Sequence, residues 1–183
     1  MKKRLFFAIN LPQGLKTELA NLVEKLNKLQ PNREIIWTKE ENFHITLHFL
    51  GDVPVEDIKR LDEVAGNFAL NNKYFKIVTR DFDCFPDKER PKIIFLGMGH
   101  SGLAYSLRQK FGDTLLTKGF SFDLKRWHPH ITLGRVRDRG GSCRFTKESF
   151  PDTEIEVKSF ELMESVDDES GTKYVVLGSY ELG

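Results

Sequence analysis

The tetrapeptide His-Ile-Thr-Leu occurs twice in this chain, at residues 44–47 and again at residues 130–133. Each copy contains β-branched residues and alternates polar with apolar side chains, which predicts a β-strand. Because side chains alternate between the two faces of a strand, the histidine and threonine of each copy share one face. A strand that only closes a hydrophobic core does not need these residues on its second face. The repeat therefore indicates two strands that together carry a functional site.

The segments that precede the two motifs have the same order. A strand at 5–9 and a helix at about 13–29 precede the first motif, and a strand at 92–98 and a helix at about 101–118 precede the second. Phe6 lies 38 residues before His44, and Phe95 lies 35 residues before His130. This repetition predicts an α+β fold built from a duplicated unit, with a pseudo-twofold axis that brings the two motif strands together. The pattern also predicts a helix at 54–70, a strand at 74–79, a loop at 81–90 and a C-terminal hairpin from 155–165 and 173–180.

Composition limits the class of protein. With 183 residues and 39% apolar side chains, the chain can bury a sizeable core as one domain or two small lobes. Together with the duplicated order of elements, this predicts that residues 1–183 form a single domain of two pseudo-symmetric lobes. The net charge of +1 does not indicate a general nucleic-acid binder. No apolar run is long enough for a membrane span, and the apolar stretch near the start is too short for a signal peptide. We therefore expect a cytoplasmic monomer, with Cys84 and Cys143 as free thiols.

The paired motifs resemble those of the 2H phosphoesterase superfamily, and more narrowly those of the RNA 2′,3′-cyclic phosphodiesterases, also called 2′-5′ RNA ligases. The resemblance covers nearly the whole chain and rests on these stretches: 4–9, Trp37, 44–51, Phe85-Pro86 before Ile93, and 128–135. It implies a bilobal fold in which two antiparallel sheets line a central cleft. It also implies hydrolysis of the 2′,3′-cyclic phosphate ends of RNA or nucleotides to 2′-phosphomonoesters, with reversible 2′-5′ ligation as a further activity. No metal or other cofactor is expected.

The residue types of the motifs suit this chemistry. Opening a cyclic phosphodiester needs a base that takes a proton from water and an acid that protonates the departing sugar oxygen. Histidine, with a reference pKa of about 6.5, can serve in either role. The resemblance implies that His44 is the acid and His130 the base, whereas the symmetric motifs alone leave the two roles unassigned. Thr46 and Thr132 are expected to donate hydrogen bonds to the phosphate oxygens as charge develops.

Two further residues are expected to contact substrate. Arg135 resembles a family arginine that binds the phosphate, and a guanidinium suits that role. Strict alternation would turn Arg135 away from Thr132, so a bend or bulge near Gly134 is expected. His48 shares the face of His44 by alternation and is expected to line the cleft, although relatives often carry lysine at its position.

Other interpretations remain open at this stage. A zinc enzyme could use His44, His48, His128 and His130 as ligands, but no Asp, Glu or Cys accompanies them at ligand spacing. His128, next to Pro129, could instead only shape the start of its strand. A catalytically silent protein that binds RNA ends is a third class. Residues 125–144 hold six Lys or Arg and one Asp, a pattern typical of an RNA phosphate track or of a solvated rim.

Overall fold

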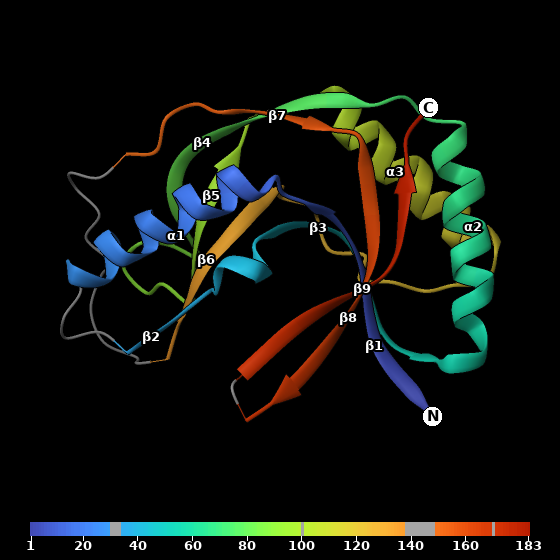
Figure 1. Ribbon diagram of the computed structural model, residues 1–183, viewed down its shortest axis with the longest axis horizontal. Helices are drawn as coiled ribbons and strands as arrows, with labels where there is room; N and C mark the ends of the chain where they lie inside the picture. Colours follow the sequence, from blue (N-terminus) through green and yellow to red (C-terminus); the bar gives the residue numbers. More distant parts are fainter. Residues whose placement is uncertain (30–33, 100, 138–148, 170) are drawn as a thin grey trace.

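The computed structural model describes residues 1–29, 34–99, 101–137, 149–169 and 171–183. The three α-helices of the described residues lie in the first two thirds of the chain, and the described part of the last third contains strands (Figure 1). In chain order the elements are β1 (Lys2–Asn10), α1 (Gln13–Lys28), β2 (Ile35–Trp37), η1 (Glu40–Asn42), β3 (His44–Pro54), η2 (Val55–Asp57), α2 (Ile58–Leu70), β4 (Phe75–Phe85), β5 (Ile93–Met98), α3 (Gly102–Thr117), β6 (His130–Val136), β7 (Glu154–Val157), β8 (Ser159–Asp168) and β9 (Gly171–Glu181).

The strands form an antiparallel sheet with the order β7-β4-β5-β6-β3-β1-β8-β9, and β2 pairs with β6. The two halves of this order meet where β3 lies beside β6, and the pairing there is limited to Ile45 opposite Ile131. The two sheets expected from the sequence are therefore the two halves of one continuous, curled sheet. This junction is also where the two His-Ile-Thr-Leu motifs meet.

Helices α1 and α3 each pack on the half of the sheet that does not contain the strand before them. The ring of Phe111 on α3, which follows β5, contacts Phe7 of β1 and Phe160 of β8. On the other side, Nε1 of Trp37 in β2 donates a hydrogen bond to Asn27 of α1, and Figure 1 shows α1 near β5 and β6. This exchange of helices is the arrangement that a pseudo-twofold relation between two α+β units requires.

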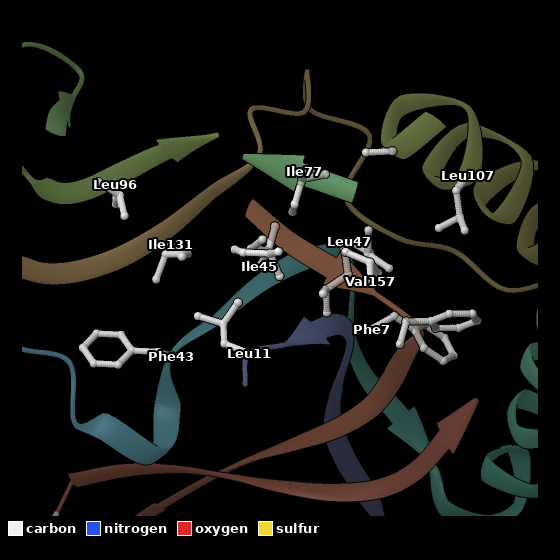
Figure 2. Packing of buried hydrophobic residues seen from close by; sticks show 14 of the residues in the cluster. Phe7, Leu11, Phe43, Ile45, Leu47, Ile77, Leu96, Leu107, Ile131 and Val157 are labelled. Atoms are coloured by element: carbon white, nitrogen blue, oxygen red, sulfur yellow. The ribbon is translucent and has the colours of Figure 1, made fainter. Parts of the chain in front are cut away.

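The apolar members of the two motifs hold the junction together. Ile45 and Ile131 are fully buried, and Leu47 and Leu133 lie in the same continuous cluster, which extends through both halves of the sheet. Figure 2 shows Ile45, Leu47 and Ile131 among the side chains of this cluster. Truncating a buried isoleucine to alanine typically costs about 2–5 kcal/mol of unfolding free energy. The core face of each motif therefore fixes where its polar face points.

Several element boundaries follow from recognisable sequence signals. The side chain of Ser101 accepts a hydrogen bond from the Ala104 N–H and caps α3, as predicted. Gly119 ends that helix with a φ of 81°, in the left-handed region that glycine tolerates.

Two predicted boundaries were wrong. The loop expected at 81–90 is strand β4 as far as Phe85, because Phe82 and Cys84 are buried while Asp81 and Asp83 are exposed. The C-terminal segment 155–165 contains two strands, since β7 pairs with β4 whereas β8 pairs with β1. Pairing with distant strands therefore made β4 longer than the local pattern predicted. It also divided the predicted C-terminal strand into β7 and β8.

Some sequence expectations fall partly outside the described residues. Cys84 is buried in the core, whereas Cys143 lies outside the described ranges. The basic stretch is described only as far as residue 137. Within the described chain, every helix is too short or too polar to cross a bilayer.

Candidate active site

The two motifs place their polar side chains on one face of the junction. Since β3 and β6 run antiparallel with Ile45 opposite Ile131, His44 falls opposite Thr132 and Thr46 falls opposite His130. Directly opposite residues in such a pair have Cβ atoms about 4.5–5.5 Å apart. The two imidazoles therefore lie on a diagonal, with a threonine beside each, around the pseudo-twofold axis.

Both imidazoles are held by the same kind of hydrogen bond. Nδ1 of His44 lies 2.7 Å from the carbonyl oxygen of Asn42, and Nδ1 of His130 lies 2.6 Å from the carbonyl oxygen of His128. A carbonyl only accepts, so Nδ1 carries the proton in each ring and Nε2 of the neutral imidazole is left as an acceptor. Nε2 of His44 lies 3.0 Å from Oγ1 of Thr46. The backbone carbonyls thus set the same tautomer in both rings and leave Nε2 of each ring as the nitrogen that can accept a proton.

Burial makes both imidazoles difficult to protonate. The pKa of His44 is lowered to about 4, chiefly by burial; positive charge on His130, Lys16 and Arg135 acts in the same direction, and the Asn42 carbonyl opposes it. Burial also lowers the pKa of His130, although the His128 carbonyl acts in the other direction. Both rings are therefore neutral at pH 7 when no substrate is bound.

A pocket of about 410 Å³ opens on this polar face. Its lining combines the motif residues with cations and aromatic rings: Arg4, Phe6, Thr38, Asn42, His44, Thr46, Phe49, Thr132, Arg135, Ser165, Asp167, Thr172 and Tyr174. His130 is not among these lining residues; its ring packs edge-on against Phe85 and Phe95. Two guanidiniums and one carboxylate, Asp167, give the pocket an excess of positive charge, which suits an anion.

Arg135 reaches the pocket because β6 contains a bulge. Thr132 lies opposite Phe95 and Gly134 lies opposite Ile94, so Leu133 is the extra residue and the alternation changes parity there. The expected irregularity near Gly134 is confirmed. Gly134 itself is required for a different reason, because a Cβ at this position would lie 2.8 Å from the Trp37 ring on β2.

A matching bulge in β3 moves His48 out of the pocket. Ala8 lies opposite Thr46 and Phe7 lies opposite His48, which leaves Leu47 as the extra residue. The prediction that His48 lines the cleft with His44 was therefore wrong, since the bulge reverses the alternation that placed it there.

His48 belongs to the core on the other face of the sheet. The side chain is 2% exposed, and its ring packs at 4.2 Å from that of Phe122. Its Nε2 donates to the carbonyl oxygen of Arg108, 2.8 Å away. Its Nδ1 has no hydrogen-bond partner among the described residues. Burial lowers the pKa of His48 to about 4, so the ring is neutral at pH 7.

Comparison with known proteins agrees with this arrangement. Residues 9–95 match the family model described as LigT like Phosphoesterase. The RNA 2′,3′-cyclic phosphodiesterase of Thermotoga maritima is 30% identical over 176 residues, which cover 95% of this chain and 92% of that protein. This chain belongs to the LigT-like phosphoesterase family. The family resemblance inferred from the two motifs is thereby confirmed.

Solved structures that include E. coli LigT share the fold. TT0787 of Thermus thermophilus superposes with a TM-score of 0.81 at 26% identity, covering 98% of this chain and 97% of that one. LigT of E. coli complexed with 3′-AMP superposes with a TM-score of 0.78 at 26% identity, covering 100% of this chain and 99% of that one. The α+β class and the curled antiparallel sheet are therefore those of this family.

The geometry does not assemble the zinc set considered from the sequence. His48 lies on the opposite face of the sheet from His44, so the four histidines do not converge. Within the described ranges, no group of three His, Cys, Asp or Glu side chains is placed to hold a metal ion.

Sequence reasoning missed several residues of the pocket. The side chain of Asn42 accepts a hydrogen bond from the Tyr174 N–H and donates one to the Thr172 carbonyl, which ties β9 to the start of the first motif. The ring of Tyr174 then packs edge-on against His44. No local signal identifies these residues, because their contacts span about 130 positions of the chain. Arg4 could have been found, since alternation along β1 places it with the pocket residue Phe6.

Proposed function

We propose that this LigT-like phosphoesterase hydrolyses the 2′,3′-cyclic phosphate ends of RNA or nucleotides to 2′-phosphomonoesters by two-histidine acid–base catalysis. The observation that carries the proposal is the antiparallel crossing of the two motifs. It sets His44 and His130 on a diagonal, each with its Nδ1 on a carbonyl oxygen and a threonine close by. The names of the curated relatives, RNA 2′,3′-cyclic phosphodiesterase, support the substrate class.

The side chains of the pocket divide the reaction between them. Arg135 binds the non-bridging oxygens of the cyclic phosphate by charge-assisted hydrogen bonds. Nε2 of His130 takes a proton from a water molecule as the water oxygen bonds to phosphorus. The bond from phosphorus to the 3′ oxygen breaks in line with this attack, and Nε2 of His44 gives its proton to that oxygen. The product is a 2′-phosphomonoester, and the proton returns from His130 to His44 through solvent.

His44 must hold a proton before it can act as the acid. Its pKa of about 4 leaves few protonated molecules at pH 7. A cyclic phosphodiester carries a negative charge, and a negative charge beside an imidazole favours its protonated form. Substrate binding therefore raises the pKa of His44 and charges the acid only when the phosphate is in place.

The two threonines act on the developing charge. Thr46 and Thr132 flank the imidazoles and line the pocket, so their hydroxyls can donate to the equatorial phosphate oxygens. In the structure, Oγ1 of Thr46 lies 3.0 Å from Nε2 of His44. We therefore expect this hydroxyl to exchange the imidazole for a phosphate oxygen when substrate binds.

The same machinery supports ligation. If the 5′ hydroxyl of a second RNA takes the place of water, His130 removes its proton and the attack on phosphorus produces a 2′-5′ linkage. Microscopic reversibility then gives cleavage of such a linkage with the two histidine roles exchanged. Whether hydrolysis or ligation dominates depends on whether water or an RNA hydroxyl occupies the position next to His130.

A turnover assay tests the proposed function. The purified protein is treated with EDTA and incubated with 2′,3′-cyclic AMP, and the products are identified by phosphorus NMR. We expect conversion to 2′-AMP at the same rate with and without EDTA, and no conversion by a His44→Ala variant. Absence of turnover would favour the silent RNA-end binder. Activity that is lost in EDTA and restored by a divalent ion would favour a metal-dependent mechanism.

A further inference from the structure

A second groove opens beside the catalytic motifs, and the reaction proposed above does not use it. The groove has a volume of about 470 Å³. Part of its lining comes from α3 and part from the segment that leads into β6; together these residues are Tyr105, Arg108, Gln109, Arg126, Trp127 and His128.

Two walls of this groove are attached to the catalytic motifs. Nε1 of Trp127 donates a hydrogen bond to the carbonyl oxygen of Thr46, 2.8 Å away. The carbonyl of His128 holds Nδ1 of His130, and two residues of chain span at most about 7 Å. The groove is therefore joined to the backbone of both motif strands.

The side chains of the groove have the chemistry of a single-stranded nucleic-acid site. The ring of Tyr105 packs edge-on against Trp127 at 5.0 Å and is 37% exposed, so a flat ligand can contact it. The guanidinium of Arg108 lies 5.6 Å from the Trp127 ring. Arg126 is exposed, and no carboxylate belongs to the described lining, although Asp123 acts on Arg108 from the adjoining loop. Aromatic faces that stack bases and arginines that neutralise phosphates are the usual parts of such a site.

We propose that this groove binds one nucleotide of single-stranded RNA next to the reacting phosphate. The base stacks on Tyr105, and Arg126 neutralises a backbone phosphate. The inference rests on the proposed function, since it extends the same substrate beyond its terminal nucleoside. It predicts that the enzyme prefers an RNA end to an isolated cyclic nucleotide.

The test compares two substrates that share a terminal nucleoside 2′,3′-cyclic phosphate, a mononucleotide and a trinucleotide. We expect the wild type to favour the trinucleotide by at least about fivefold in kcat/KM, because one base–aromatic stack supplies a factor of this size. Tyr105→Ala should remove most of this preference, and Tyr105→Phe should retain it. Arg126→Ala should also weaken it and should reduce the salt dependence of kcat/KM for the trinucleotide by about 0.7 in log–log slope.

Matched controls lie away from the groove. Tyr74 is an exposed tyrosine and Arg60 is a partly exposed arginine on α2, so Tyr74→Ala and Arg60→Ala should keep the preference and its salt slope. Trp127 is left intact because it also holds the Thr46 carbonyl. A merely structural role of Tyr105 would lower kcat/KM for both substrates equally, and this result would overturn the proposal.

A binding experiment distinguishes whether the nucleotide in the groove belongs to the substrate strand or to a second RNA strand. If the wild type shows no preference for the trinucleotide, an oligonucleotide with a 5′ hydroxyl is titrated into the protein by fluorescence anisotropy. Affinity that falls in Tyr105→Ala would assign the groove to a second RNA strand; affinity that Tyr105→Ala leaves unchanged would overturn the proposal. Absence of turnover with both substrates would contradict the proposed function alone, since RNA affinity that depends on Tyr105 would still support the groove.

Discussion

Replacing His48 tests whether its side chain lies in the core, as the structure shows, or in the catalytic pocket, as strict strand alternation would place it. His48 is 2% exposed, and its Nε2 donates to the Arg108 carbonyl on the face opposite the pocket. The variant His48→Gln keeps an amide N–H near the position of Nε2 and cannot be protonated. We expect it to retain kcat/KM for a 2′,3′-cyclic nucleotide within about threefold at pH 7, because no atom of His48 lines the pocket.

The same variant should change how stability depends on pH. The pKa of His48 is about 4 in the folded protein, compared with about 6.5 for histidine in an unfolded chain. The folded state therefore binds fewer protons between these values, and the wild type loses stability as the pH falls through this window. Between pH 7 and pH 4.5 the linkage amounts to about 2 kcal/mol of unfolding free energy for this one ring. The glutamine variant lacks this contribution.

The assay is urea unfolding of both proteins at pH 7 and at pH 4.5. The fall in unfolding free energy on acidification should be smaller in His48→Gln by about 2 kcal/mol. His44→Gln is the control for activity, since it changes a pocket histidine and should abolish turnover. Equal acid sensitivity of the wild type and His48→Gln would refute the buried neutral imidazole. A large loss of activity in His48→Gln would refute its placement by the bulge.

Three further predictions concern the catalytic residues. His44→Ala and His130→Ala should each lose at least about 10²-fold in kcat, because each removes one proton transfer; near wild-type turnover by either would contradict the two-histidine mechanism. Thr46→Ala and Thr132→Ala should each raise the barrier by about 2–4 kcal/mol, measured from kcat/KM, since each removes a donor to the charged phosphate. Because burial lowers the pKa of both catalytic histidines, kcat/KM should be greatest below pH 6.5, where the fraction of enzyme with His44 protonated and His130 neutral is largest. An optimum at or above pH 7 would exclude this assignment of protonation states.

The sequence predicted the parts of the site that depend on local pattern. The two His-x-Thr strands, the matching order of strand and helix before each, and the caps of α3 follow from alternation, helical spacing and short signals. These features also carried the family resemblance. The monomeric state and the cytoplasmic location stay predictions, as do the roles of the individual site residues.

The sequence could not predict where the alternation changes. The bulged residue in each strand is the last residue of the motif, Leu47 or Leu133, and its side chain type gives no sign of the bulge. In β3 the bulge is held by donors from distant segments, since Nε of Arg108 donates to the Leu47 carbonyl and Nε1 of Trp127 donates to the Thr46 carbonyl. A bulge was expected near Arg135 only because the family resemblance placed that side chain at the phosphate. No such requirement pointed to the bulge before His48.

The assignment of acid and base is tested most directly with a substrate that no longer needs the acid. In a 2′,3′-cyclic phosphate whose 3′ bridging oxygen is replaced by sulfur, the leaving group is a thiolate with a thiol pKa of about 8.5, which departs without protonation. The attacking water still needs its base. We expect this substrate to restore much of the rate lost in His44→Ala and little of the rate lost in His130→Ala. The reverse pattern would exchange the two roles, and rescue of neither variant would contradict proton donation to the 3′ oxygen by either histidine.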